Sequence, residues 1–236
     1  MSKIEELILS QDFGYLQPWF YNHQYALRCE LAKPAKSTKK RVKSAYKNAI
    51  DIYKIIFPNQ IDAVFFTYIV GDYPFGFHNT DNYLKELQKE FEWTKSYEWN
   101  IKSIVKGFKN EINFFYKYQN KYRNIVVTDL EHYDDDENYI LRKNRVICYI
   151  DNKKFNYKKL IKRCVLTDFG SVKGGGKETY DTSFVSFENE CILSIYDDRG
   201  CDIVFATKEK YQEFYQKLQK YLLEYDVEEM QRRYNN

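Results

Sequence analysis

The sequence predicts an α/β fold of the α+β type, built on a mixed sheet. Three features indicate this: a strand–helix–strand–helix order near the N-terminus, three short β runs near the C-terminus, and a long amphipathic helix after them. The first feature predicts an N-terminal crossover unit with its helices on the sheet. The second predicts a C-terminal antiparallel meander. We expect one domain over 1–236, with a core over about 25–225.

The period of the hydrophobic residues predicts the N-terminal elements. Strands are expected where β-branched and aromatic residues cluster, and helices where apolar residues recur at helical spacing after a capping residue. The resulting elements are a short helix after the Ser2-x-x-Glu5 capping box, a strand over 25–31, a helix over 41–57 that ends before Pro58, a strand over 63–70 and a helix after Thr80.

The same signals continue through the rest of the chain. The expected elements are strands over 125–128 and 146–150, a helix over 158–165, meander strands over 183–187, 191–196 and 201–206, and a long helix capped by Thr207. An apolar stripe from Tyr211 to Tyr225 lies on that helix. Asp226 is expected to cap a short last helix that carries Met230. Four of the nine glycines fall in 170–176, which predicts a loop.

Composition indicates a core and a surface that are both rich in rings. Aromatic residues make up 18% of the chain, with 23 Tyr and 17 Phe. Tyrosine buries an apolar body and keeps a hydroxyl at the surface, so it suits both a core and a protein-binding face. The formal net charge of +3 is too small to imply a nucleic-acid partner by itself.

The sequence predicts a cytoplasmic protein with no membrane partner. Residues 1–10 carry acids where a signal peptide needs bases. The most apolar stretch, 61–70, is far too short to cross a bilayer. The five cysteines are odd in number and include no C-x-x-C pair, so we expect reduced and mostly buried thiols.

Two charge runs are candidate partner-facing patches. Lys33–Lys47 carries seven bases and no acid, while Asp129–Glu137 carries six acids and no lysine or arginine. Each run is also consistent with a solvated loop or helix start. The candidate binding residues within the acidic run are Tyr133, Asp134, Asp135, Asp136 and Glu137.

Known catalytic and cofactor spacings fail when they are applied to this chain. The glycine run ends in Gly176-Lys177-Glu178, so a phosphate-binding loop lacks both its first glycine and its final Ser or Thr. A calcium loop begun at Asp134 needs glycine where Tyr139 stands. No pair of histidines has metal-ligand spacing. We therefore assign no catalytic residue, no metal site and no cofactor.

One local motif lies between two of the meander strands. Its residues are Tyr196, Asp197, Asp198, Arg199, Gly200 and Asp202, here called the YDDRG turn. Asp and Gly are turn formers, but a turn does not require an arginine flanked by carboxylates. The arginine can lock the turn or hold an anionic ligand. We interpret the motif as structural, with Arg199 paired and partly buried and Gly200 at positive φ.

The YDDRG turn, followed by a short strand and a long helix, resembles the bacterial domain-of-unknown-function family 3885. Ala26–Leu31 is similar to the early R-x-E-L strand of that family, and Ala49–Phe57 to the helix before its next strand. Cys29 departs from the family pattern, which has an aromatic or aliphatic residue there. The resemblance implies no established activity, although some bacterial proteins of this kind are encoded beside toxin domains as immunity proteins.

Three functions are consistent with these observations. The first is a non-catalytic protein-binding module, such as an immunity or antitoxin-type protein that neutralises a cognate toxin domain. The alternative is an enzyme acting on a phosphate-bearing small molecule or nucleic acid. The third is nucleic-acid binding through Lys33–Lys47, ranked last because a helix cannot point all these bases one way.

Overall fold

The computed structural model describes residues 1–10, 13, 19–35, 37–70, 118, 120–133, 139–151, 153–169 and 182–235. Three predicted features lie outside these residues: the helix after Thr80, the loop over 170–176 and the acidic residues of 134–137. The other predicted helices and strands fall within the described chain.

The fold is α+β, as the sequence predicts, around one seven-stranded sheet with the order β1-β7-β6-β5-β2-β4-β3. The strands are β1 (Ala26–Glu30), β2 (Ala63–Val70), β3 (Arg123–Tyr133), β4 (Tyr139–Tyr149), β5 (Thr182–Ser186), β6 (Cys191–Ile195) and β7 (Gly200–Phe205). The three C-terminal strands form the predicted antiparallel meander.

The prediction of a mixed sheet is wrong for the described strands, because each pair of neighbours is antiparallel. The N-terminal crossover is present, since β1 and β2 run in the same direction and a helix connects them. The three meander strands lie between β1 and β2 in the sheet and pair with both. Among the described strands, no two parallel strands are therefore hydrogen-bonded to each other.

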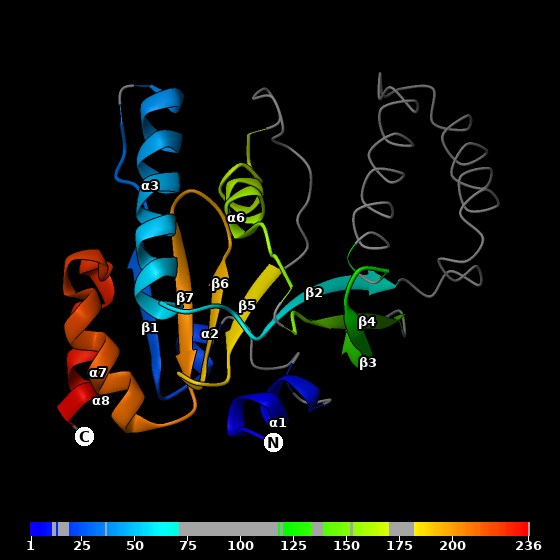
Figure 1. Ribbon diagram of the computed structural model, residues 1–236. Coiled ribbons are helices and arrows are strands. Elements are labelled where there is room, and N and C mark those ends of the chain that lie inside the picture. The colour runs from blue at the N-terminus through cyan, green and yellow to red at the C-terminus, as the bar shows by residue number, and fades with distance from the viewer. Residues whose placement is uncertain are drawn as a thin grey trace.

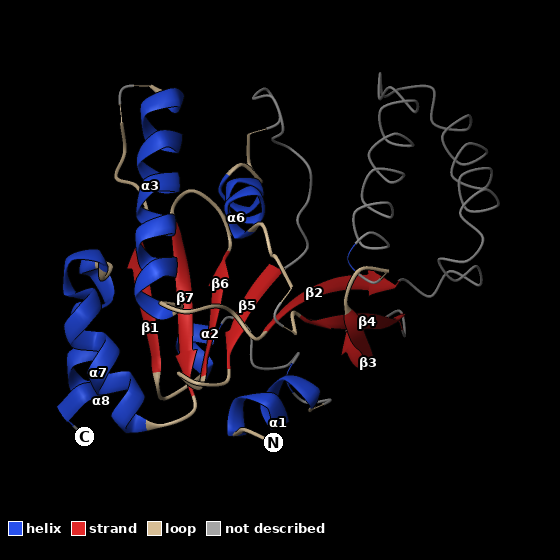
Figure 2. Cartoon of the chain, in the orientation of Figure 1, coloured by secondary structure: helices blue, strands red, loops and turns tan. Residues whose placement is uncertain are grey.

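Helices cover both faces of the sheet. They are α1 (Lys3–Leu9), α2 (Trp19–Asn22), α3 (Thr38–Ile56), α6 (Tyr157–Val165), α7 (Lys208–Leu218) and α8 (Val227–Asn235). In Figure 1, α3 and α6 lie side by side in front of the sheet, whereas α2 lies behind β1 and β7. Figure 2 shows α7 and α8 beside the β1 edge. Among the described residues, no helix is long and apolar enough to cross a membrane.

Capping side chains fix where the helices begin. In each case a polar side chain accepts a hydrogen bond from the backbone N–H three residues later, which satisfies one of the amides that a helix start leaves free. The caps are Ser2 for α1, Ser37 for α3, Asn156 for α6 and Thr207 for α7. The Ser2 cap of the predicted capping box and the Thr207 cap are thus confirmed.

The long C-terminal helix is shorter than predicted. It ends at Leu218, and short 3₁₀ turns at Gln219–Tyr221 and Glu224–Asp226 lead into α8. Between these turns, Leu222 bridges to Cys29, and the Leu223 N–H donates to the Arg28 carbonyl at 2.9 Å. Covering an edge strand satisfies its open backbone groups, so pairing with β1 replaces the last helical turns.

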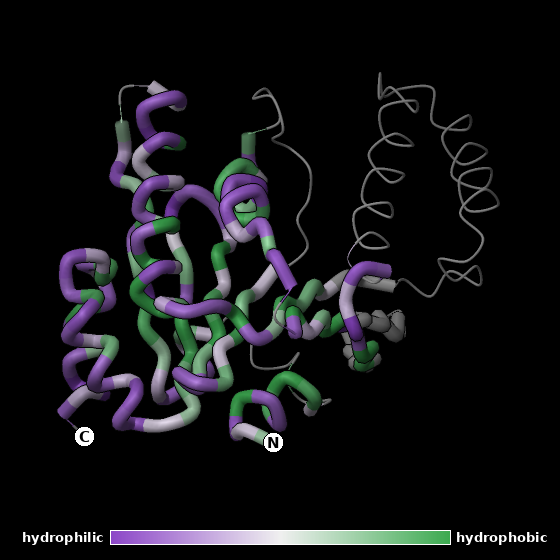
Figure 3. Tube along the Cα trace, in the orientation of Figure 1, coloured by the Kyte–Doolittle hydropathy of each residue, from purple (hydrophilic) through white to green (hydrophobic). Residues whose placement is uncertain are grey.

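The hydrophobic core is built on the buried strands of the sheet. All residues of β5 and β7 are buried, and Figure 3 shows the hydrophobic colour running along the central strands. Rings fill the space between α3, α6 and the sheet, where Tyr53 stacks on Tyr157 at 4.2 Å and meets Phe184 edge-on. All five cysteines are buried and free of disulfides.

Candidate functional site

The YDDRG turn connects β6 to β7, and its first carboxylate closes the turn upon itself. Asp197 accepts hydrogen bonds from the Arg199 backbone N–H at 2.6 Å and from Arg199 Nε at 2.7 Å. The Asp197 side chain is 5% exposed. The predicted pairing of Arg199 is therefore confirmed.

Arg199 itself is not partly buried as predicted, because its side chain is 67% exposed. The guanidinium lies over the outside of the turn, where it also approaches Asp168 Oδ2 at 3.5 Å. An exposed ion pair is screened by water and contributes little to stability. The anchor of this turn is thus the buried carboxylate with its backbone hydrogen bond.

The second carboxylate connects the turn to the start of α3. Asp198 is 2% exposed, forms an ion pair with Arg41 Nε, and accepts a hydrogen bond from Arg41 Nη2 at 3.2 Å. Burial raises the pKa of Asp198, and the charge of Arg41 opposes this shift. Arg41 belongs to the basic run of the sequence, but its side chain forms an ion pair within the fold, with Asp198.

The third carboxylate connects β7 to β1 and α2. Asp202 and Arg28 are cross-strand partners, and their side chains form two hydrogen bonds of 2.9 and 3.1 Å. Asp202 also accepts from the Phe20 N–H at 3.2 Å. The rings of Phe20 and Tyr21 lie 4.8 and 4.7 Å from the Arg28 guanidinium carbon, so cation–π contacts add to the ion pair.

Gly200 is required for close approach rather than for a positive φ. A Cβ at this position would lie 2.1 Å from the Tyr196 hydroxyl and 2.8 Å from the Cys29 carbonyl oxygen. The φ of Gly200 lies outside the left-handed region, so the predicted reason for the glycine is wrong. The residue is small because Tyr196 lies across it.

The three carboxylates of the turn are therefore each held by an arginine, two of them from other elements. The turn is visible in the sequence, whereas no local pattern near it indicates Arg28 and Arg41 as its partners. Arg28 could have been found from the R-x-E-L strand, and Arg41 was counted only as part of a charge run. Each of these carboxylates is thus engaged by contacts within the chain itself.

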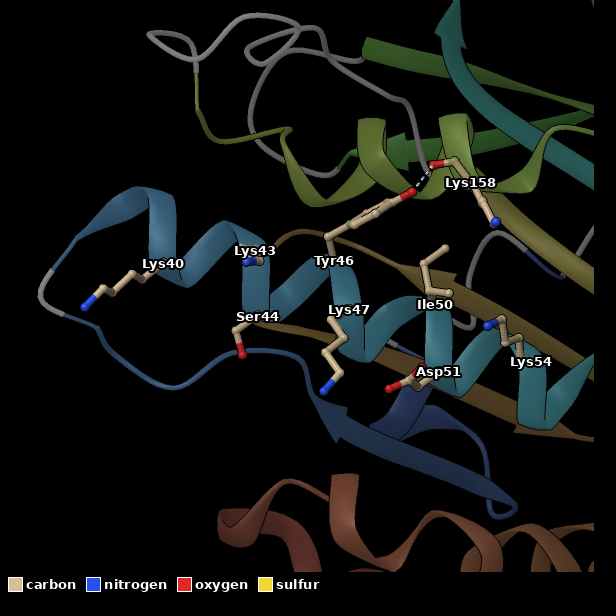
Figure 4. A pocket seen from close by; sticks show the side chains of 9 residues that line it. All are labelled: Lys40, Lys43, Ser44, Tyr46, Lys47, Ile50, Asp51, Lys54 and Lys158. Carbon is tan, nitrogen blue, oxygen red and sulfur yellow. Dashed lines mark hydrogen bonds between the residues drawn. The ribbon is translucent and has the colours of Figure 1, made fainter.

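A second group of side chains lies on the outer side of α3 around a hollow of about 590 Å³ (Figure 4). Its rim carries five lysines, and we call this group the lysine face: Lys40, Lys43, Lys47, Lys54 and Lys158. Tyr46 and Ile50 line the hollow between them. None of the five ammonium groups forms an ion pair with any residue of the described ranges.

A further hollow, of about 800 Å³, lies on the other flank of α3. The two hollows share one ridge of the helix, formed by Lys40, Ser44, Lys47 and Asp51. The second hollow is bounded by the 30–35 segment and by residues of 220–224, which follow α7. It includes Glu30 and Glu224 as well as lysines, so its charge is mixed and the lysine face is the more one-sided surface.

The predicted acidic patch cannot be compared with this surface. Asp134, Asp135, Asp136 and Glu137 lie outside the described residues, and Tyr133 is described only as the end of β3. The basic run divides as helix geometry requires: Lys40, Lys43 and Lys47 reach the hollow, whereas Arg41 turns to Asp198. Within the described ranges, no group of three or more His, Cys, Asp or Glu side chains could hold a metal ion.

Comparison with known proteins gives one result that bears on this architecture. Residues 6–226 match the family described as Domain of unknown function (DUF3885). No curated protein and no solved structure matches the chain. The matched range includes all seven strands, the YDDRG turn and the lysine face. Because the match covers nearly the whole sequence, the chain belongs to the DUF3885 family.

Proposed function

We propose that this chain is a non-catalytic protein-binding module, an immunity or antitoxin-type protein that neutralises a cognate toxin domain in the cytoplasm. The observation that carries the proposal is the lysine face. Five lysines without ion-pair partners in the described chain are among the residues that line one hollow. A surface that is mostly of one charge attracts an oppositely charged partner and steers it toward that surface.

The chemistry of the YDDRG turn supports a binding role rather than catalysis. Each of its carboxylates is held by an arginine, so the turn connects elements of the fold. The lysine face, by contrast, makes no ion pair with the residues that the structure describes. A surface of this kind can be used for recognition without any cost to the stability of the chain.

The sign of the charge indicates which partner fits. An inhibitor of a basic nuclease would carry an acidic surface, whereas this chain has a net charge of +3 and a basic hollow. We therefore propose an acidic protein surface as the partner. Exposed tyrosines such as Tyr21 and Tyr225 offer further aromatic contacts of the kind that dominate protein interfaces.

The proposal is tested with the protein encoded by the neighbouring gene. Tagged full-length chain should capture that protein, and co-expression should restore the growth of cells that the neighbour inhibits. If no complex forms and growth is not restored, the immunity proposal is wrong.

One observation favours the alternative, an enzyme or binder for a phosphate-bearing molecule, since clustered lysines also attract phosphate. Thermal denaturation with nucleotides and divalent metals distinguishes the two. A ligand present at about 100 times its dissociation constant should add about 2.7 kcal/mol of stability. An unchanged melting temperature across such ligands removes the alternative.

A further inference from the structure

We propose that the hollow between α3 and α6 binds an acidic protein segment that inserts one bulky apolar side chain between the lysines. This inference rests on the proposed protein-binding function and names the chemistry of its partner. It follows from three features of the hollow: an apolar floor, a basic rim and a rigid backing.

The floor of the hollow is apolar. Tyr46 and Ile50 lie one turn apart on α3 and face the hollow, and Ile50 is almost fully buried. The Tyr46 hydroxyl donates to the Lys158 backbone carbonyl at 3.4 Å, as the dashed line in Figure 4 shows. Because the hydroxyl is engaged, the ring is the part of Tyr46 that a ligand meets. Such a floor favours an apolar side chain over a phosphate, which needs donors on every side.

The rim of the hollow is basic. Lys43 and Lys54 come from α3 and Lys158 from the start of α6, so cations lie on both walls. Among the described lining residues, Asp51 is the one carboxylate. Lysine stems can fold over an apolar ligand while their ammonium groups meet carboxylates beside it. The pattern matches a segment in which acidic residues flank an apolar anchor.

The backing of the hollow is held firmly, which lowers the entropy lost on binding. At its start α3 is fixed by the Arg41–Asp198 ion pair, and in its middle Asn48 Nδ2 donates to the Leu31 carbonyl at 2.8 Å. The stacked rings of Tyr53 and Tyr157 connect α3 to α6. The hollow, of about 590 Å³ and open to solvent, has room for one aromatic side chain.

The test is fluorescence anisotropy with the full chain and two labelled peptides. Both peptides carry the same number of glutamates, and one has a central phenylalanine where the other has serine. We expect the phenylalanine peptide to bind at least about tenfold more tightly, because it alone fills the apolar floor. A short oligothymidylate and inorganic phosphate serve as competitors. Neither should displace the phenylalanine peptide when it supplies the same total concentration of negative charge as the peptide.

Two matched charge variants locate the binding site. Lys43→Glu with Lys158→Glu reverses one lysine of the rim on each helix, and should weaken binding of the phenylalanine peptide about tenfold or more. Lys39→Glu with Lys159→Glu makes the same change in net charge on the same two helices, but at residues outside both hollows, and should leave binding unchanged.

The floor is tested separately. Tyr46→Ser should remove the preference for phenylalanine over serine, whereas Tyr46→Phe should retain it. A melting curve establishes that each variant is folded. If Tyr46→Ser is unfolded, the peptide preference of Tyr46→Phe becomes the test of the floor. In that case Tyr46→Phe must keep at least about tenfold preference for the inference to stand.

Equal binding of the two peptides, tighter binding of oligothymidylate, or equal effects of the two charge variants would overturn the inference. These failures differ from a failure of the proposed function. If the Lys43→Glu/Lys158→Glu variant captures the neighbouring protein as well as the wild type does, the proposed protein-binding function holds, but the lysine face is not the surface that binds. If the neighbour is never captured, the proposed function fails whatever the peptides show.

Discussion

Arg28 and Asp202 are partners across the β1–β7 pairing. The Arg28 guanidinium donates two hydrogen bonds to the Asp202 carboxylate, with lengths of 2.9 and 3.1 Å. Their side chains are 14% and 7% exposed. The pair links an edge strand, its neighbour and α2, because the same carboxylate accepts the Phe20 N–H. The contacts of the YDDRG turn therefore extend to an arginine 174 residues earlier in the chain.

Removing Arg28 should destabilise the protein strongly. Arg28→Met keeps most of the side-chain volume but leaves the buried Asp202 without a counter-charge, which should cost about 2–4 kcal/mol. Urea denaturation followed by tryptophan fluorescence measures this loss. Adding Asp202→Asn to Arg28→Met should recover part of it, because the neutral amide no longer needs the guanidinium. Equal stability of the wild type and Arg28→Met would contradict this account.

Within the turn, the aspartate should matter more than the arginine. Arg199→Ala removes a mostly solvated guanidinium, so we expect a loss of about 1 kcal/mol or less. Asp197→Ala removes the acceptor of the Arg199 backbone N–H and should cost more than Arg199→Ala. Chemical denaturation of both variants under one set of conditions gives the order. The opposite order would show that the exposed guanidinium, and not the buried carboxylate, holds the turn.

Gly200→Ala should destabilise through a steric clash. The new methyl group would meet the Tyr196 hydroxyl and the Cys29 carbonyl, and overpacking of this kind costs about 1–3 kcal/mol. Adding Tyr196→Ala should restore part of the stability, since it removes one of the two clashing groups and leaves the backbone carbonyl. A double variant no more stable than Gly200→Ala alone would mean that the clash with Tyr196 is not what selects glycine here.

The buried thiols should be inert at neutral pH. Burial raises the pKa of Cys148 from its ordinary 9.0 to about 12, so folded chain binds this proton more tightly than unfolded chain. By linkage, the contribution of Cys148 to stability is constant below about pH 9 and is lost as pH rises from 9 toward 12. Iodoacetamide should label the native chain slowly at pH 7 and rapidly in denaturant.

Cys148→Ala isolates the alkaline effect. The stability of the wild type relative to this variant should not change between pH 7 and pH 8. It should fall between pH 9 and pH 10.5, which is about halfway between the unfolded and folded pKa values of Cys148. A relative stability that stays constant above pH 9 would contradict the assignment.

Local signals in the sequence predicted most of the fold. Capping residues such as Ser2 and Thr207, and runs such as Ala63–Val70, specify their elements through neighbouring backbone groups. The antiparallel sheet could not be predicted in this way, because the insertion of the meander between β1 and β2 depends on contacts between distant strands. The early end of α7 has the same origin, since Leu222 and Leu223 pair with β1.

The site was predictable only in part. The YDDRG turn is visible as an arginine among carboxylates, yet its partners Arg28 and Arg41 are brought to it by β-pairing and by the crossover helix. The run Lys33–Lys47 was visible as charge. Its division into lysines that surround a hollow and an arginine that supports the turn depends on the rotation of α3 against the sheet, which no local pattern reports.

The affinity of the full chain for the product of its neighbouring gene tests the central claim most directly. Isothermal titration calorimetry should give equal dissociation constants for the wild type and the Lys39→Glu/Lys159→Glu control. The Lys43→Glu/Lys158→Glu variant, with a melting temperature like that of the control, should bind about tenfold or more weakly. Equal affinity for all three proteins would contradict the claim that the lysine face is where this protein meets its partner.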